Sequence, residues 1–321
     1  MIIEDKVYGD VEINEKVLIK LIESKPLQRL KGIAQFGPFE LYPYPGGFTR
    51  YDHSIGVLCL LKRLNASLEE QVAGLLHDVS HTAFSHVFDW VIGNEDKEDY
   101  QDENFKLFVL GSGIPSILAD GNIPLENVVY PENYPLLERE APDLCADRVD
   151  YALRELVDTW THDTNDFLIN HLVVYDDQIV FSSEGAAEAF GRGYMGCQKY
   201  HWGGEEWTTR YDMISEIIKF GLEDGVMILE DFYQDDKHVL NKLHGSNHPY
   251  IKNKMKLLSG NLDMGMTTYF RRHKKFRWVD PLFTPNGDLY RLSEVDSEYL
   301  QLITEMKEEN EEGVKISVFS D

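Results

Sequence analysis

Apolar side chains recur at helical spacing along most of this chain. Between residues 17 and 34 they recur three and four positions apart, on either side of Pro26, which is expected to break or restart the helix. Ser67, with Glu70 three residues further on, is typical of a helix N-cap. Similar stripes predict further helices over residues 54–64, 68–77, 83–92, 102–110, 146–160, 183–194 and 209–221. The pattern therefore predicts a mainly α-helical fold.

Shorter stretches carry the pattern of strands. Residues 172–181 hold two short apolar runs on either side of Asp176 and Asp177, which predicts a small β-hairpin. After about residue 262 the pattern predicts a small α/β appendage, with strands over residues 276–283, 288–292 and 314–319 and a helix over residues 298–309. We therefore expect a helical domain over residues 1–261 and a small α/β C-terminal subdomain over residues 262–321.

The composition narrows the class of protein. Of the 321 residues, 43% are hydrophobic, which is enough to build a core and excludes a mainly disordered chain. Acidic residues outnumber basic ones by 56 to 31, and the resulting net charge of −25 argues against broad binding to nucleic acid or to an anionic membrane surface. The three cysteines, Cys59, Cys145 and Cys197, form no CxxC motif and are interpreted as thiols in a reducing compartment.

No segment of the sequence has the pattern of a targeting signal or a membrane anchor. The first residues form no basic segment followed by an apolar stretch. The longest strongly apolar run, residues 55–61, is far shorter than the ~18 residues that a membrane span requires. We therefore expect a soluble, cytoplasmic protein with no membrane partner.

Histidine and aspartate side chains gather in one short region. Four of the eleven histidines, His53, His77, His81 and His86, lie within 34 residues, and Asp78 directly follows an apolar, helix-forming stretch. A single buried histidine is most often a hydrogen-bonded core residue, but imidazole and carboxylate together are ligands for Zn, Fe, Mn or Ni. Four histidines at this spacing therefore favour a metal site.

Two more carboxylates follow in the helix that is predicted to begin at residue 146. Asp147 and Asp150 are three residues apart, so they lie on one side of that helix. Either is a candidate ligand, and Asp150 is alternatively a cap or a surface residue. Two neutral histidines and two carboxylates balance the charge of a divalent cation, so an anionic substrate would need cations nearby.

Taken in order, these residues resemble a known family. His53, the pair His77-Asp78 and Asp147 match the H…HD…D pattern of the HD-domain metal-dependent phosphohydrolases. An isolated His-Asp pair is weak evidence, whereas this ordered set is specific. The resemblance implies a helical HD-domain fold and a phosphohydrolase activity that depends on a metal.

Three segments narrow the resemblance to one branch of that family. Residues 28–37, 50–56 and 77–86 are similar to the motifs QRLxxIxQLG, RFEHSLG and HDxGHxPFSH of the deoxynucleoside triphosphate triphosphohydrolases. The resemblance covers about residues 4–160, weakens toward residue 225 and does not extend past residue 262.

The resemblance implies a role for each matching residue. His53, His77, Asp78 and Asp147 are implied to bind one divalent metal ion, and their chemistry leaves Mn, Fe, Ni, Co, Zn and Mg all open. His81 matches a catalytic histidine on the substrate side of the metal.

Other matches concern the substrate. Asp89 matches an acid that orients the catalytic group. Arg50 and Arg148 match cations that contact phosphate, and the alternative for each is an ordinary surface arginine. Tyr151 and Gln35 match side chains on the sugar side of the substrate.

Two of the sugar-side positions depart from the family. Glu155 stands where the family has aspartate, and Phe36 replaces the leucine beside the matching glutamine. We retain Glu155 as a substrate-binding candidate. The preference for deoxyribose does not carry over with these changes.

A third departure concerns acid–base catalysis. The family places another histidine shortly after the region of Asp89, but no histidine occurs here between His86 and His162. Glu103 or Asp102 is the replacement that the sequence offers, with Glu103 as our catalytic candidate. A carboxylic acid needs a raised pKa to act as an acid at neutral pH.

We therefore expect a divalent-metal-dependent phosphohydrolase that acts on a nucleotide or a related phosphate ester, with dNTP triphosphohydrolysis as the most specific form. The alternative is a regulatory module that keeps the metal and binds a nucleotide with little or no turnover. The expected partner is a small phosphate substrate and not nucleic acid, and a homo-oligomer is left open. The spacing of His77 and His81 also fits a zincin, but the glutamate that zincins use as a base is absent.

Two further features have no assigned role. The aromatic, Pro/Gly-rich segment 36–48 either lines a pocket or folds onto the core. Five of the 31 lysine and arginine residues lie within residues 271–277. This basic cluster either binds substrate or forms a solvated strand edge or a partner surface.

Overall fold

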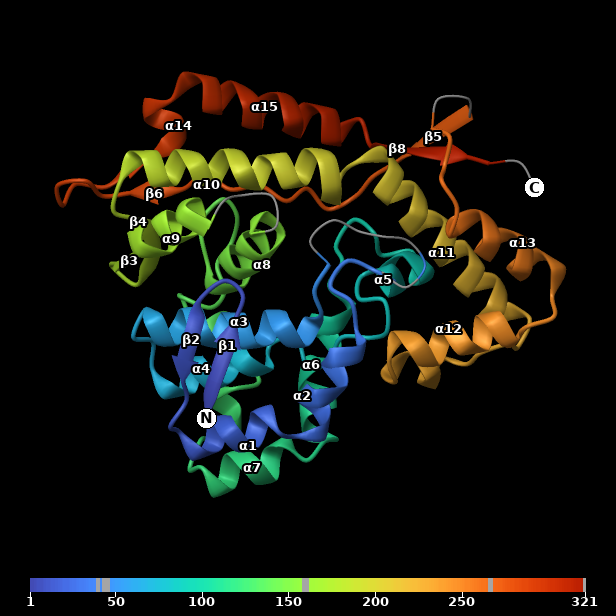
Figure 1. The fold of residues 1–321 in the computed structure, drawn as a ribbon, viewed down its shortest axis with the longest axis horizontal. Helices are drawn as coiled ribbons and strands as arrows, with labels where there is room; N and C mark the ends of the chain where they lie inside the picture. Colours follow the sequence, from blue (N-terminus) through green and yellow to red (C-terminus); the bar gives the residue numbers. More distant parts are fainter. Residues whose placement is uncertain (39–40, 42–46, 158–161, 265–267, 320–321) are drawn as a thin grey trace.

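The computed structural model describes residues 1–38, 41, 47–157, 162–264 and 268–319, apart from the side chain of residue 162. It confirms a mainly α-helical fold with small β parts (Figure 1). The α-helices are α1 (Lys16–Ile22), α2 (Lys25–Arg29), α3 (Arg50–Arg63), α4 (Leu68–Leu76), α5 (Val87–Ile92), α6 (Tyr100–Leu110), α7 (Ile114–Asp120), α8 (Ala146–Leu156), α9 (His162–His171), α10 (Glu184–Cys197), α11 (Glu205–Glu223), α12 (Asp236–Gly245), α13 (Pro249–Leu258), α14 (Leu292–Val295) and α15 (Ser297–Glu311).

The strands form small sheets at the edges of the helical body. Their bounds are β1 (Ile2–Asp5), β2 (Gly9–Glu12), β3 (Leu172–Tyr175), β4 (Gln178–Phe181), β5 (Thr268–Arg272), β6 (Leu282–Phe283), β7 (Tyr290–Arg291) and β8 (Val314–Val318). The pairs β1–β2 and β5–β8 are antiparallel, and a third sheet has the order β3-β4-β6-β7. Its β4 and β6 pair in parallel at Phe181 and Phe283, so both sides of residue 262 contribute to one sheet.

Three hydrophobic clusters hold the helices together. The first helices, α1 to α4 with α6 and α7, enclose one cluster at the N-terminal end of the fold (Figure 1). A second cluster lies among α3, α8, α10 and α15, and a third among α5, α11, α12 and α13. Helix α3 packs against both α4 and α8, which positions the side chains of these three helices around one centre.

Local capping signals decide where the central helices begin. The helix predicted from residue 54 begins at Arg50, because Thr49 accepts from the backbone N–H of Asp52 and the Asp52 carboxylate accepts from that of Thr49. The predicted cap at Ser67 is confirmed, and its Oγ accepts from the backbone N–H of Glu70 at 3.1 Å. Both helices are therefore anchored at the end that their sequence specifies.

The prediction of a strand over residues 276–283 is wrong for residues 276–281. Only Leu282–Phe283 forms a strand there. The backbone N–H of Asp280 donates at 3.0 Å to the carbonyl of Pro142, which lies in a loop and not in a neighbouring strand. Alternating apolar residues bury side chains in either case, but a strand also requires a partner strand, which the tertiary fold does not supply.

Some elements were missed, and some predictions lie outside the described residues. The β1–β2 hairpin, β5, α7, α9, α12, α13 and α14 were not predicted. Most of the aromatic segment after Pro38 and the predicted helix end at residues 158–160 lie outside the described part of the chain. Among the helices that are described, none is long and apolar enough to cross a lipid bilayer.

Candidate metal centre

Three ligating side chains converge from three helices. His53 lies near the start of α3, His77 is the C-cap of α4, and Asp147 lies in the first turn of α8. The Nε2 atoms of His53 and His77 are 3.2 Å apart, and Asp147 Oδ1 lies 2.8 Å from the former and 3.5 Å from the latter. Donor atoms that share one cation at ~2.0–2.2 Å are separated by about 3 Å.

Asp78 reaches the same centre. Its Oδ1 lies 3.5 Å from His77 Nε2, and its Oδ2 lies 3.7 Å from His53 Nε2. The guanidinium of Arg50 donates to Asp78 Oδ2 at 2.8 Å, and both of these side chains are about 4% exposed. The structure therefore brings together all four residues that the sequence indicated as ligands.

The second ring nitrogen of each histidine has a partner behind the centre. His53 Nδ1 lies 2.7 Å from Asp150 Oδ2, and His77 Nδ1 lies 2.8 Å from the carbonyl oxygen of Gly74. Since both partners only accept, each Nδ1 carries a proton, so each Nε2 is the atom that would bind a cation in the centre. Carboxylate and carbonyl partners of this kind orient histidines that bind metals.

Asp150 belongs to a buried chain of charges that reaches the N-terminal hairpin. It is fully buried, so it is neither the helix cap nor the surface residue that the sequence left open. Arg154 Nε donates to Asp150 Oδ2 at 2.8 Å, and Arg154 Nη2 donates to Asp5 Oδ2 at 2.6 Å. The position of His53 thus depends on residues from α8 and β1.

The four side chains create a local surplus of negative charge. Burial lowers the pKa of His77, but Asp78 and Asp147 outweigh it and raise that pKa to about 10. Hydrogen bonds from His53 and His77 overcome burial and hold the pKa of Asp147 below its usual range. A divalent cation fits this site, because it would replace the protons that the two carboxylates draw onto the histidine nitrogens.

A second group of candidate ligands shares Asp147. One ligand atom from each of Glu138, Cys145 and Asp147 lies within 4.8 Å of the other two. Burial, followed by the charge of Asp147, raises the pKa of Glu138 to about 8. The sequence analysis missed Glu138, because no motif or spacing connects the loop before α8 to the histidines.

A tight turn places His81 beside Asp78. His81 Nε2 lies 3.2 Å from Asp78 Oδ1, and burial followed by the nearby Arg50 lowers the pKa of His81 to about 3. Phe84 and Ser85 follow with positive φ angles of 63° and 55°, a strained conformation for residues other than glycine. His81 is therefore a neutral side chain on a rigid turn.

Hydrogen bonds from two sides hold this turn. The backbone N–H of Phe84 donates to Asp236 Oδ1 at 2.7 Å, and Ser85 Oγ accepts from Arg50 Nε at 2.9 Å. His86 follows, and its ring packs edge-on against that of His81 at 5.0 Å. Asp89 Oδ2 lies 3.2 Å from His86 Nδ1, so the structure places Asp89 beside His86.

The sugar-side candidates lie among aromatic rings. Tyr151 packs against His53 at 6.2 Å and against Trp202 at 5.3 Å between ring centroids. Glu155 forms an ion pair with His201, and Gln35 is buried with its side-chain oxygen unpaired in the described structure. Tyr151 and Glu155 therefore lie against Trp202 and His201, which are neighbours in the chain.

The two remaining candidates are Arg148, expected to contact phosphate, and Glu103, expected to act in catalysis. The guanidinium of Arg148 donates to the backbone carbonyls of Arg139 and Asp143, at 3.2 Å and 2.5 Å. Glu103 is exposed on α6, and no described contact joins it to the metal centre. The segment before α6 instead turns another carboxylate inward, that of Glu98, which is 2% exposed.

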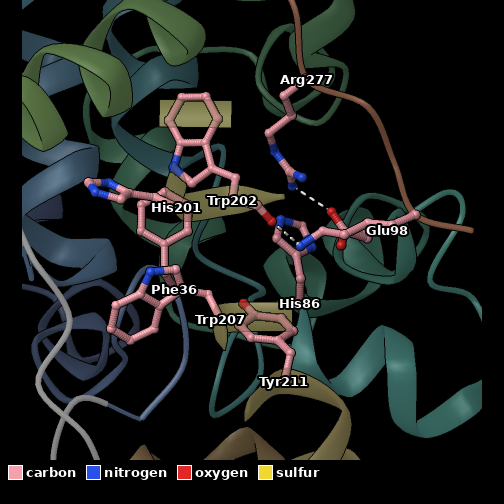
Figure 2. A pocket seen from close by; sticks show the side chains of 9 residues that line it. Phe36, His86, Glu98, His201, Trp202, Trp207, Tyr211 and Arg277 are labelled. Atoms are coloured by element: carbon pink, nitrogen blue, oxygen red, sulfur yellow. Dashed lines mark hydrogen bonds and ion pairs between the residues drawn. The ribbon is translucent and has the colours of Figure 1, made fainter. Parts of the chain in front are cut away.

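An aromatic pocket with a cavity volume of about 20 Å³ lies beside the centre. Figure 2 shows Trp202, Trp207 and Tyr211 around it, with Arg277 facing Glu98 across the opposite side. The pocket reaches the metal centre through His86, which contacts His81. No sequence motif pointed to the tryptophans, although Arg277 belongs to the basic cluster.

We expect Asp150→Asn to weaken metal binding about 10- to 100-fold, because partners of metal-binding histidines contribute that much to affinity. The substitution removes the charge that holds the His53 Nδ1 proton and leaves Arg154 with Asp5 alone. Titration of Mn²⁺ or Co²⁺ into chelated protein measures the affinity. The exposed Asp10→Asn in β2 is the control, and equal affinities for the two variants would contradict the expectation.

A family model and curated relatives match this chain. The model described as "HD domain" matches residues 50–114. Protein YdhJ of Bacillus subtilis, whose function is uncharacterised, is 37% identical over 288 residues, which is 88% of each chain. The metal-dependent phosphohydrolase cns2 of Cordyceps militaris is 40% identical over 157 residues, 49% of this chain and 45% of that protein.

Two further comparisons support less, the first because it covers a small part of the chain and the second because the sequence identity is low. A deoxynucleoside triphosphate triphosphohydrolase of Bos taurus is 36% identical over 104 residues, 27% of this chain and 17% of that protein. The crystal structure of a phosphohydrolase from Bacteroides thetaiotaomicron superposes with a TM-score of 0.71 over 99% of this chain and 98% of that one. At 19% identity, the superposition supports the fold alone.

Proposed function

This chain belongs to the HD-domain metal-dependent phosphohydrolases, and on that premise we propose that it hydrolyses a phosphate ester or anhydride of a nucleotide. The observation that carries the proposal is the convergence of two histidine Nε2 atoms with carboxylates of Asp78 and Asp147. His53, His77, Asp78 and Asp147 would hold the metal. The fold and the donor set both support this assignment.

A divalent cation held there would polarise a phosphoryl oxygen and lower the pKa of water. The protein's own residues would orient the substrate around it. His81 is neutral and lies beside Asp78, so it is able to donate a hydrogen bond to a phosphoryl oxygen. Asp89 would act through His86, whose ring it contacts.

Arg50 has a supporting role in this proposal. Its guanidinium is already engaged by Asp78 and Ser85 and is only 3% exposed. We infer that it holds the Asp78 carboxylate in place and is not the principal phosphate contact. Cations for the phosphate would therefore come from elsewhere in the pocket.

The nucleotide assignment is the finer part of the proposal. It is supported by the aromatic side chains that line the pocket beside the centre and by the partial similarity to a dNTP triphosphohydrolase. Gln35, Tyr151 and Glu155 would contact the sugar. Triphosphate is the most specific form of the proposed substrate.

A regulatory module that binds a nucleotide with little turnover is the second candidate. Its support is the segment over residues 96–105, which has no histidine. Glu98 of that segment points into the pocket, where it forms an ion pair with Arg277. A carboxylate at this place is a poor proton donor, because its pKa is held below the usual range.

The test is the metal content of the purified protein, followed by a phosphate-release screen. The screen uses nucleoside mono-, di- and triphosphates with Mn²⁺, Co²⁺, Ni²⁺ and Mg²⁺. Stoichiometric metal with tripolyphosphate release from dNTPs would support triphosphohydrolysis, and orthophosphate release from monophosphates would support a phosphatase. Bound metal without release from any substrate would favour the regulatory module, and a lack of metal after reconstitution would overturn both candidates.

A further inference from the structure

The basic cluster of residues 271–277 divides into two parts with different surroundings. Arg271 and Arg272 do not line the pocket and form ion pairs, the first with Glu312 at 3.3 Å and the second with Glu95 at 2.8 Å and Asp212 at 2.9 Å. Lys274 and Arg277 instead line the pocket beside the metal centre. The cluster is therefore only in part a charged strand edge.

Lys274 carries a positive charge into this pocket without a carboxylate in contact. Its Nζ donates to the backbone carbonyl of Trp202 at 2.6 Å, and it lies over the rings of Trp90 and Tyr211 at 5.6 Å and 5.2 Å. Among the described residues, no acidic side chain forms an ion pair with it. Desolvation of an ammonium is costly unless an anion compensates it.

Another polar group among the residues that line this pocket has no partner in the described structure. Trp202 is only 4% exposed, and its buried indole nitrogen donates to no acceptor in the described structure. A buried donor left without an acceptor destabilises the protein by ~1–3 kcal/mol. A ligand that accepts hydrogen bonds would satisfy it.

Arg277 is the third hydrogen-bond donor that lines the pocket, and the carboxylate of Glu98 already balances its charge. Its guanidinium forms an ion pair with Glu98, shown facing it in Figure 2. Glu98 adopts a positive φ of 52°, so the backbone is strained where it presents this carboxylate. Together, Lys274, Arg277 and Glu98 leave one net positive charge in a mostly aromatic pocket.

We propose that Lys274, Arg277 and the indole N–H of Trp202 form an anion-binding subsite, which holds a phosphate group of the substrate beside the metal centre. The subsite joins the C-terminal segment to the HD domain in a single binding pocket. It provides the cation that a nucleotide requires on a protein of net charge −25. The identity of the anion as part of the substrate rests on the proposed function, whereas the subsite itself does not.

Replacement of Lys274 by Met tests the subsite through binding alone. Titration calorimetry of the metal-loaded protein with sodium sulfate should show affinity at least about tenfold weaker than that of the unmodified protein, because a charge-assisted hydrogen bond is lost. Lys275→Met, one residue along and exposed, is the matched control and should bind sulfate unchanged. Equal affinities for the two variants would overturn the subsite.

Two further variants separate binding from folding. Lys274→Arg keeps the charge and should retain most of the sulfate affinity. Trp202→Phe keeps a ring and removes the N–H, so the affinity should fall a few-fold. If Lys274→Met unfolds, the other variants still test the proposal. It would be overturned if Trp202→Phe kept full sulfate affinity and if Lys274→Arg and Lys274→Gln bound sulfate equally well.

Steady-state kinetics then decides whether the anion belongs to the substrate. With a substrate from the phosphate-release screen, Lys274→Met should raise KM by about tenfold with kcat less affected. An unchanged KM with lost sulfate binding would overturn the assignment to the substrate and indicate a separate anionic ligand. Sulfate binding that depends on Lys274 in a protein without turnover would count against the proposed function and not against the subsite.

Sulfate affinity should also fall as the pH rises through about 8. Burial is the main cause that lowers the pKa of Lys274 to about 8, with Arg277 acting in the same direction and Glu98 opposing it. Lys274 is charged below that pH and neutral above it, so the attraction for an anion is present below pH 8 and is lost above it.

Sulfate is the probe of choice because its charge is constant over this range. The charged groups around the ammonium include Glu98 and Arg277, whose shifted pKa values keep them ionised. His86 and Tyr211 line the same pocket, and Arg272 lies over the same Trp90 ring as Lys274 and is paired with Glu95 and Asp212. In Lys274→Met, sulfate affinity should lose its dependence on pH between 7 and 9. The same dependence in both proteins would contradict the role of Lys274.

Discussion

Replacement of His77 or Asp147 by alanine is expected to remove the bound metal and to lower phosphate release by about a thousandfold or more. Each side chain presents one donor atom to the shared centre, where His77 Nε2 and Asp147 Oδ1 lie 3.5 Å apart. The loss of one ligand removes Lewis-acid stabilisation worth several kcal/mol, which corresponds to a rate factor of ~10³. Metal content by mass spectrometry and turnover of the best substrate from the screen measure the two effects.

The control for these variants is an exposed histidine far along the chain. His244→Ala, on α12, should leave both the metal content and the turnover unchanged. Circular dichroism of each variant checks that the helices remain. Full metal content in folded His77→Ala protein would contradict the assignment of this residue as a ligand, and turnover that survives metal removal would contradict metal-dependent hydrolysis.

Gly56→Ala is expected to destabilise the protein by about 3 kcal/mol or more. A Cβ at this position of α3 would lie 1.9 Å from Arg154 Nη2 and 2.0 Å from Asp150 Oδ1. Neither atom has room to move without breaking the buried ion pairs that join Asp150, Arg154 and Asp5, and breaking a buried pair costs about 3–5 kcal/mol. Urea denaturation of metal-loaded protein measures the free energy of unfolding.

A second glycine-to-alanine substitution provides the matched comparison. Gly196 lies in α10, and a Cβ there would meet nothing within 4 Å. Gly196→Ala should therefore stabilise the protein by up to about 1 kcal/mol, since alanine favours a helix. If Gly56→Ala were as well tolerated as Gly196→Ala, the buried charge chain behind His53 would be far less rigid than its contacts indicate.

The helices could be predicted because their signals are local. Ser67 caps α4 through the backbone N–H of Glu70, three residues away. Apolar spacing likewise indicated α10 and α11 to within a few residues of their bounds. Of the strand predicted over residues 276–283, only Leu282–Phe283 forms, because a strand needs a neighbouring strand from elsewhere in the chain.

The metal centre could be predicted from the sequence because its ligands occur in an ordered pattern along the chain. His53, the pair His77-Asp78 and Asp147 were all singled out, and α3, α4 and α8 bring them together. The sequence could not say which nitrogen of His53 faces the centre. That depends on the contact with Asp150, 97 residues along the chain.

The sequence by itself determined the helical class, the capped start of α4 and the types of side chain that meet at the centre. Periodicity, caps and motifs each depend on residues close together in the chain. Only the tertiary structure decided that Glu98 faces Arg277 across 179 residues, and that Lys274 turns into the pocket while Lys275 stays exposed. Neighbouring lysines are alike in sequence, and their surroundings differ because the packing turns one toward the pocket and leaves the other exposed.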